Sequence, residues 1–269
     1  LHQIDILHEN QKNSDYQKWL FTYDASIMEN KKGVEVISPI SEFNPTFRQE
    51  LFQICNFIEK REGSINDNCA LHIHVGFWVF RFNLYALKKL LLIMSYYEPE
   101  LNLFFAGEQQ QIRPLAQDLW ARNMTNVLDN LEERFHLFWQ EDYDQFLNII
   151  QKIDKTYVLN LKNTTLENQL LPNTIELRNP NASLSPFVLS NNIYTFLKIV
   201  DYCLANNNYH DLYYRWKEVL KEKNRKPNDQ KAMELAIKIF QSKEDIHYFK
   251  MQYEKTDTFR TLVKKRIVW

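Results

Sequence analysis

The chain is poor in glycine: its 269 residues contain only 4, at Gly33, Gly63, Gly76 and Gly107. A P-loop or a G-x-G-x-x-G turn needs several glycines close together, because only glycine lets the backbone approach a phosphate group that closely. The four glycines lie far apart in the sequence. Both of these nucleotide-binding devices are therefore excluded.

The chain also lacks an excess of charge and a long hydrophobic run. Its 33 Lys and Arg residues nearly balance 34 Asp and Glu residues, for a net charge of -1. No overall field attracts nucleic acid or an anionic membrane surface, so we predict neither partner. The longest apolar stretch, residues 84–105, is interrupted by charges such as Lys88 and Glu98, and no membrane-spanning segment is predicted.

Cysteine is scarce as well, with Cys55, Cys69 and Cys203 as the 3 examples. An odd number at wide spacing favours reduced thiols over a disulfide framework. We therefore expect a cytoplasmic protein, either in the cell that makes it or in a host cell into which it is delivered. The chain opens at Leu1 rather than at Met, so we expect its natural start to lie upstream.

The composition indicates a folded protein, since 45% of the residues are hydrophobic and 14% are aromatic. The pattern of hydrophobic residues divides the chain into two parts. Up to about Asn181, strand-like and helix-like runs alternate, whereas helical periodicity dominates from Pro186 onward. The predicted strands cover residues 1–8, 19–27, 34–40, 70–77, 157–161 and 174–179. The predicted helices cover residues 45–61, 83–105 with a break at Pro99, 115–137, 143–153, 186–205, 209–223, 229–241, 245–253 and 258–267.

Four of the predicted strands carry polar side chains on one face only. Successive strand residues point to opposite faces, so the apolar residues of each strand separate from its polar ones. The polar sets contain acidic, imidazole and guanidinium groups: Asp24, Glu35, His72, His74, Glu176 and Arg178. An ordinary solvent face would more often present Lys, Thr, Gln and Ser. The pattern therefore predicts a functional site on one face of a sheet.

Carboxylates and imidazoles together can hold Mg²⁺ or Mn²⁺, and Arg178 offers a planar donor group for a phosphate or a carboxylate. Each pair also has an ordinary structural interpretation. His72 and His74 can be half-buried strand residues, and Glu176 with Arg178 can form a cross-strand salt bridge. The coincidence of all these groups on matching faces favours the site.

The order of the motifs resembles that of the amidoligase family, which belongs to the carboxylate-amine ligases with a glutamine-synthetase-like fold. The resemblance rests on "YDASI" from Tyr23, "GVEVISP" from Gly33, "CALHIHVG" from Cys69 and "TIELRNPNAS" from Thr174. It covers roughly residues 19–192. The family usually begins with a G-x-E-x-E strand, which nothing before Asp24 matches. Three explanations stay open: such a strand lies upstream of Leu1, the site has lost these ligands, or other residues replace them.

The resemblance implies an α+β fold in which an antiparallel sheet with a concave polar face is backed by helices and followed by a C-terminal helical region. It implies a catalytic core at residues 1–185 with a helical insertion at about 83–155, and helices at 186–269 packed on that core. It also implies ATP and Mg²⁺ or Mn²⁺ as cofactors. The implied roles are metal binding by Glu35, His72 and Glu176, cofactor binding by His74, Arg178, Arg113 and Asn181, and catalysis by Arg178, His74 and Asp24. Glu98 and Asn160 fall at further family positions.

The implied reaction joins a small-molecule or peptide carboxylate, with a protein substrate as one possibility, to an amine through an acyl phosphate. A second hypothesis is a degenerate member of the family that binds nucleotide or a protein partner without turnover. A third is a metal-dependent hydrolase that uses His72 and His74 around a water molecule. The sequence leaves these alternatives open.

Overall fold

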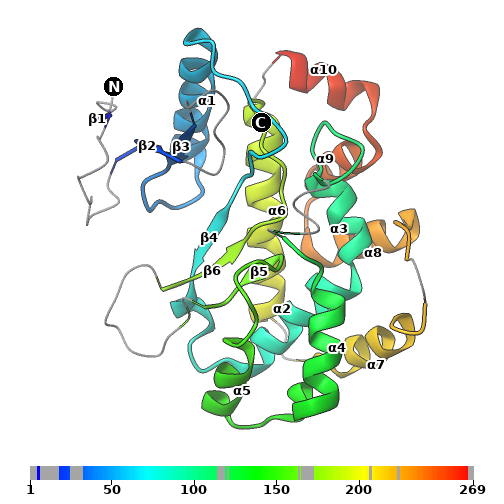
Figure 1. Cartoon of the computed structure of the whole chain (residues 1–269). Helices are drawn as coiled ribbons and strands as arrows, with labels where there is room; N and C mark the ends of the chain where they lie inside the picture. Colours follow the sequence, from blue (N-terminus) through cyan, green and yellow to red (C-terminus); the bar gives the residue numbers. More distant parts are fainter. Residues whose placement is uncertain are drawn as a thin grey trace.

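The computed structural model describes residues 5–6, 18–24, 33–113, 119, 121–162, 164, 173–205, 208–222 and 225–265. Within these ranges the strands are β1 (Asp5–Ile6), β2 (Leu20–Tyr23), β3 (Val34–Ile37), β4 (Ile73–Gly76), β5 (Leu159–Asn160) and β6 (Thr174–Leu177) (Figure 1). Each lies inside a predicted strand segment, and β2 to β6 are shorter than predicted. Residues 1–4 and 7–8 of the predicted first strand lie outside the described residues. Residues 25–27 of the predicted second strand lie outside the described residues.

The described strands form two three-stranded sheets, in the orders β1-β2-β3 and β4-β6-β5. The predicted antiparallel pairing is confirmed for three of the four described strand pairs. The described strands differ from the expected single sheet because they form two, and because β1 pairs with β2 in parallel. A parallel pair needs a long connection between its strands, and residues 7–19 supply the length. Hydrophobic alternation carries no information about strand direction, so the sequence pattern could not have shown this pairing.

The helices hold many more residues than the strands, and most of them lie on one side of the two sheets (Figure 1). They are α1 (Pro45–Lys60), α2 (Leu84–Tyr96), α3 (Glu98–Phe105), α4 (Met124–Phe135), α5 (Tyr143–Ile150), α6 (Pro186–Ala205), α7 (His210–Val219), α8 (Asp229–Ile239), α9 (Lys243–Glu254) and α10 (Asp257–Lys265), with short 3₁₀ helices η2 (Phe77–Phe80) and η4 (Leu137–Trp139). The α+β class is thus confirmed. The break predicted at Pro99 is also confirmed, since Pro99 lies in the first turn of α3.

Of the predicted helix at residues 115–137, residues 115–118 and 120 lie outside the described residues, and α4 forms the described helical part, beginning at Met124. The preceding Asn123 has φ -59° and ψ 140° and is not helical. The carboxylate of Glu98 accepts hydrogen bonds from the backbone N–H of Met124 and from the Oγ1 of Thr125, the latter at 2.6 Å. A side chain from another helix thus caps α4 at this position, which local sequence cannot reveal.

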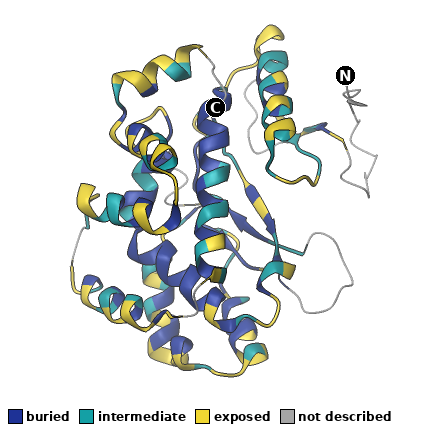
Figure 2. Ribbon diagram, turned by 180° about the vertical axis from the view of Figure 1, so that it is seen from behind, coloured by how far each residue is buried: buried dark blue, intermediate teal, exposed yellow. Residues whose placement is uncertain are grey.

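The main hydrophobic core extends from Ile73 on β4 to Tyr253 on α9, so the C-terminal helices share a core with the second sheet. Helix α6 lies at its centre and contacts α1, α2, α8, α9 and α10. Figure 2 shows this helix as a mostly buried column. A smaller cluster around Trp19 and Leu51 joins the first sheet and α1 to Leu189 of α6. The helical layer therefore fixes both sheets against one common support.

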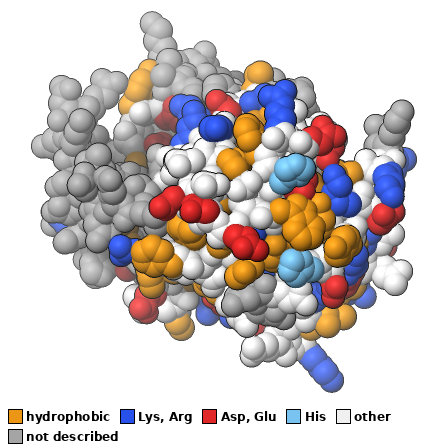
Figure 3. Space-filling model, turned by 90° about the horizontal axis from the view of Figure 1, so that it is seen from below, with side chains coloured by type: hydrophobic (Ala, Val, Ile, Leu, Met, Phe, Trp, Pro, Cys, Tyr) orange, Lys and Arg blue, Asp and Glu red, His pale blue; other side chains and the backbone are white. Residues whose placement is uncertain are grey.

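The surface of the molecule shows no separation of side-chain types on the end seen from below, where the described acidic, basic and hydrophobic side chains are interspersed (Figure 3). Among the described residues, no helix is both long and apolar enough to cross a bilayer. Cys55, Cys69 and Cys203 are all free, as their number and spacing predicted.

Glu98 makes the free energy of unfolding depend on pH. Burial raises the pKa of its carboxyl to about 7, against the hydrogen bonds from Thr125 and Met124 that lower it. Because the folded state holds the proton more tightly, this group stabilises the fold fully below about pH 4.5. That stabilisation, up to about 3 kcal/mol, is lost as the pH rises to about 7.

Glu98→Gln removes this titration, so we expect the unfolding free energy of the variant to change less between pH 5 and pH 7.5 than that of the wild type. Urea unfolding at the two pH values measures the difference. Glu133→Gln, at an exposed position of the same helix that Glu98 caps, is the control and should follow the wild type. Coincident pH profiles for Glu98→Gln and the wild type would contradict the assignment.

Candidate active site

Strands β4 and β6 present a polar face opposite the hydrophobic core. Ile73 and Val75 of β4 and Ile175 and Leu177 of β6 are buried. His74 pairs directly with Glu176 in the antiparallel register, and both side chains point away from that core. The alternation expected from the sequence is confirmed for these two strands.

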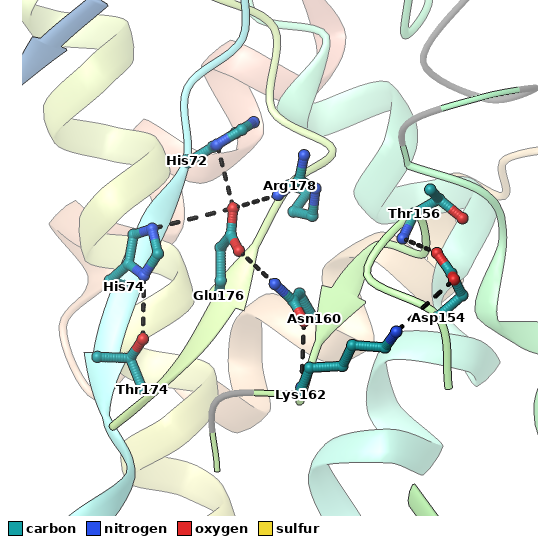
Figure 4. A network of polar contacts seen from close by, with 9 residues as sticks. All are labelled: His72, His74, Asp154, Thr156, Asn160, Lys162, Thr174, Glu176 and Arg178. Carbon is teal, nitrogen blue, oxygen red and sulfur yellow. Dashed lines mark hydrogen bonds and ion pairs between the residues drawn. The ribbon is translucent and has the colours of Figure 1, made fainter. Parts of the chain in front are cut away.

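Glu176 is the central acceptor of the polar face (Figure 4). Its Oε1 atom accepts a hydrogen bond from Arg178 Nη1 at 2.5 Å and lies 3.1 Å from His72 Nδ1. Its Oε2 atom accepts from Asn160 Nδ2 at 2.6 Å, across the β5–β6 pair. Although Glu176 is only 5% exposed, its carboxylate is thus held by three side chains from three strands or strand ends.

These contacts keep Glu176 ionised. Burial alone would raise the pKa of its carboxyl, but the hydrogen bond from His72 and the charge of Arg178, with a further contribution from Asn160, bring the pKa down to about 2. The site therefore holds a permanent negative charge at neutral pH. A buried carboxylate of this kind suits the recognition of a cation or the positioning of cationic groups.

His74 is fixed by a second contact on the same face. Its Nδ1 atom lies 3.0 Å from Thr174 Oγ1, and its Nε2 atom lies 3.9 Å from Glu176 Oε1. Burial lowers the pKa of the His74 imidazole, and the neighbouring His72 and Arg178 add to this effect against the charge of Glu176. His74 is therefore neutral at pH 7 and can either donate or accept a hydrogen bond.

The first sheet contributes its acidic residues to the same place. The pKa of the Glu35 carboxyl is raised by partial burial and by the negative charges of Asp24 and Glu176, while His72 lowers it. Glu35 lies on β3 and Asp24 follows β2, so these couplings join the two sheets. The structure thus joins His72, His74, Glu176 and Arg178 in one network. Glu35 lies within electrostatic range of His72 and Glu176, and Asp24 lies within electrostatic range of Glu35.

In the first sheet, the apolar face predicted from the sequence is only partly buried. Tyr23 and Val34, a directly opposed pair, are 45% and 52% exposed, although the strand pattern predicts an apolar face packed under helices. The small cluster beneath this sheet includes Phe21 and Val36 instead. Helix α1 therefore covers only the part of the sheet nearer Leu20, which alternation alone does not specify.

Other predicted site residues have structural partners outside this network. The side chain of Asn181 donates to the carbonyl oxygens of Ala106 and Gln111 and accepts from the backbone N–H of Arg113, so it holds the loop after α3. The Nη1 atom of Arg113 donates to the carbonyl oxygen of Cys69 at 2.5 Å. Burial lowers the pKa of the Arg113 guanidinium, with Arg178 adding to the effect, so the two guanidinium groups lie within electrostatic range.

The sequence pattern missed the contributions of Thr174 and Lys162. Thr174 lies two residues before Glu176 on the same strand, so its side chain points to the same face. This spacing could have identified Thr174 from the sequence. The backbone N–H of Lys162 donates to Asn160 Oδ1 at 3.1 Å, so the turn after β5 orients the amide that holds Glu176. Lys162 Nζ also lies 3.9 Å from Asp154 Oδ2, which extends the network to the edge of the site (Figure 4).

The chain was compared with known protein families, curated proteins and solved structures. A family model described as "Putative amidoligase enzyme" matches residues 5–200 of the chain, a span that includes all six residues of the polar face. No curated protein and no solved structure matches the chain. In the part of the chain that the structure describes, no group of three or more His, Cys, Asp or Glu side chains is arranged to hold a metal ion.

Proposed function

Because this chain belongs to the amidoligase family, we propose that it is a carboxylate–amine ligase that uses ATP and a divalent metal ion, Mg²⁺ or Mn²⁺. The single observation that carries the proposal is the His72–Glu176–Arg178 network, to which Glu35 of the other sheet is electrostatically coupled. The proposal includes a glutamine-synthetase-like fold, in which this polar face binds the nucleotide and the helices support it.

The residue types suit a hard divalent cation, although the described residues hold no pre-arranged group of three ligands. Glu35, Asp24 and Glu176 supply oxygen atoms and His72 supplies an imidazole, which are ligand types that Mg²⁺ or Mn²⁺ accepts. Burial is the main cause of the raised pKa of Glu35, and the negative charges of Asp24 and Glu176 add to it. A cation bound by Glu35, His72 and Glu176 would offset that repulsion. The metal would neutralise phosphate charge, and ATP would convert the substrate carboxylate into an acyl phosphate.

The residues of the chain have separate parts in this proposal. Arg178 binds an anionic oxygen of the nucleotide or substrate through its planar guanidinium group. His74, neutral and fixed by Thr174, hydrogen bonds to a phosphate oxygen as a donor. Asp24, which follows β2 and is electrostatically coupled to Glu35, binds the incoming amine in this proposal. A protein carboxylate is one candidate substrate, and we place the reaction in a cytoplasm, where free thiols persist.

A second candidate function is favoured by the arrangement of the acidic and imidazole side chains. The absence of a pre-arranged group of three ligands among the described residues fits a family member that binds nucleotide or a protein partner without turnover. The two candidates differ in one measurable property. A ligase releases phosphate from ATP when its carboxylate and amine are supplied, whereas a binding module does not.

Isothermal titration calorimetry of the full chain with ATP and Mg²⁺ or Mn²⁺ tests the proposal. We expect binding in the wild type and an affinity lowered about 10- to 100-fold in His72→Ala, because this variant loses a metal ligand and a partner of Glu176. His247→Ala, at an exposed position on α9, is the matched control and should bind like the wild type. Absence of ATP binding at millimolar metal would rule the ligase out.

Turnover is measured separately as phosphate release from ATP in the presence of pooled amino acids and amines. Release that depends on both pools supports the ligase. Nucleotide binding without release in any pool supports the non-catalytic member of the family.

A further inference from the structure

Gly76 marks the end of the polar face on β4. It lies two residues beyond His74, so a side chain at this position would point to the same face as His72 and His74. Gly76 pairs directly with Thr174, whose hydroxyl contacts His74 on that face. The cross-strand register therefore places Gly76 on the polar side of the sheet and not on the core side.

The side chain of Trp78 occupies the space that a side chain at position 76 would fill. A Cβ atom added to Gly76 would lie 2.6 Å from Trp78 Nε1 and 2.7 Å from Trp78 Cδ1. The pyrrole edge of the indole thus rests directly on the glycine backbone. Any larger residue at position 76 would force the indole to shift, so this glycine permits the close approach.

Trp78 is 76% exposed although tryptophan is among the most apolar side chains. With its edge on Gly76 and the rest of the ring in solvent, the indole forms a flat aromatic surface at the border of the site. A planar ligand group can stack there and bury apolar area on both partners.

The order of the side chains along β4 indicates how a bound nucleotide would be oriented. His72 lies opposite the Arg178 end of β6 and is electrostatically coupled to Glu35, so positive charge and metal-ligand types concentrate at this end. His74 and Thr174 follow, and Gly76 with Trp78 comes last. A nucleotide aligned with the strand has its phosphates at His72 and Arg178 and its base at Trp78.

We propose that Trp78 is the base-stacking residue of this protein, and that Gly76 is required to seat its indole beside the nucleotide site. The inference rests on the proposed nucleotide-dependent function and adds the residue that recognises the base. Stacking of a base on an aromatic side chain accounts for about a 5- to 150-fold gain in affinity. The recognition is tolerant of base identity, because every base has a flat face.

The test compares ATP with inorganic tripolyphosphate, each with Mg²⁺, by calorimetry on the full chain. Tripolyphosphate has the phosphate chain without a base. Trp78→Ala is expected to weaken ATP binding about 5- to 150-fold and to leave tripolyphosphate binding unchanged. Trp78→Phe, with a smaller ring, should fall between the wild type and Trp78→Ala. Trp139→Ala, which removes a half-exposed indole from η4, is the control.

Gly76→Ala displaces the indole of Trp78 without removing it. Like Trp78→Ala, it should weaken the binding of ATP and leave the binding of tripolyphosphate unchanged. Circular dichroism and thermal melting of each variant verify the fold. Equal ATP affinity of Trp78→Ala and the wild type overturns the inference, and so does a loss that is the same for both ligands. If the wild type binds tripolyphosphate and ATP equally, the phosphate site stands and the stacking role falls. If it binds neither, the proposed function falls as well.

Discussion

Replacement of Glu176 by alanine is expected to abolish detectable binding of ATP with Mg²⁺, a loss of about 100-fold or more. This carboxylate is the acceptor that Arg178, His72 and Asn160 share. Its removal takes away a proposed metal ligand and also releases the three side chains that it aligns. Calorimetry with ATP and Mg²⁺ measures the effect.

Glu176→Gln separates charge from shape, because the amide has nearly the same size and keeps one acceptor oxygen. We expect it to lose metal-dependent nucleotide binding like the alanine variant while it disturbs the fold less. Glu234→Gln is the matched control, since Glu234 also pairs with an arginine, Arg215, but lies on α8 outside the polar face. ATP affinity within about twofold of the wild type in Glu176→Ala would contradict the central role of this residue.

Glu176 also has a stability signature. Its folded pKa of about 2 lies below the ordinary value of 4.5, so its contribution is fully present above about pH 4.5 and is lost as the pH falls through about 2. Removal of one partner from a buried ion pair costs about 3 kcal/mol, because the remaining charge has no counterpart. Urea unfolding of Glu176→Ala at pH 7 should show a loss of that order.

The second large effect is expected in the core. Trp216 of α7 is fully buried, donates a hydrogen bond from Nε1 to Ser95 Oγ at 2.8 Å, and packs against the ring of Phe138 with centroids 5.2 Å apart. Trp216→Ala should lower the free energy of unfolding by about 3–5 kcal/mol, since it leaves a large cavity and an unfilled hydrogen bond. Urea unfolding monitored by circular dichroism measures this loss.

Two other tryptophan variants calibrate that result. Trp216→Phe keeps most of the apolar volume and should be less costly than alanine. Trp78→Ala removes an exposed indole and should change the unfolding free energy by about 0.5 kcal/mol or less. A loss below 1 kcal/mol in Trp216→Ala would show that α7 is not an integral part of the core. The outcome matters because Trp216 lies beyond the span matched by the family.

Much of the site could be predicted from local pattern. Alternation places His72 and His74 on one face of a strand and Glu176 and Arg178 on one face of another, and the structure pairs His74 with Glu176. Strand periodicity depends only on backbone geometry, so it can be read from a short segment. The helix at residues 186–205 was predicted with its observed bounds for the same reason, since a sustained apolar period and an initial proline are local signals.

Other site properties depend on partners far along the chain. The charge state of Glu176 depends on His72, more than a hundred residues away, and on Asn160. The buried amide of Asn181 organises the loop before Arg113, although the family resemblance implies cofactor binding for both residues. No local pattern distinguishes an asparagine that binds a ligand from one that holds a loop, because both are polar residues in a turn.

By itself the sequence determined which residues alternate, which segments are helical and, through the scarcity of glycine, that no glycine-rich loop can hold a phosphate. Only the tertiary structure decided that the strands form two sheets, that Glu98 caps α4, and that the exposed indole of Trp78 rests on Gly76. The physical reason is the range of the interactions. Periodicity and propensity act over a few residues, whereas caps, ion pairs and close backbone approaches join segments whose meeting depends on the whole fold.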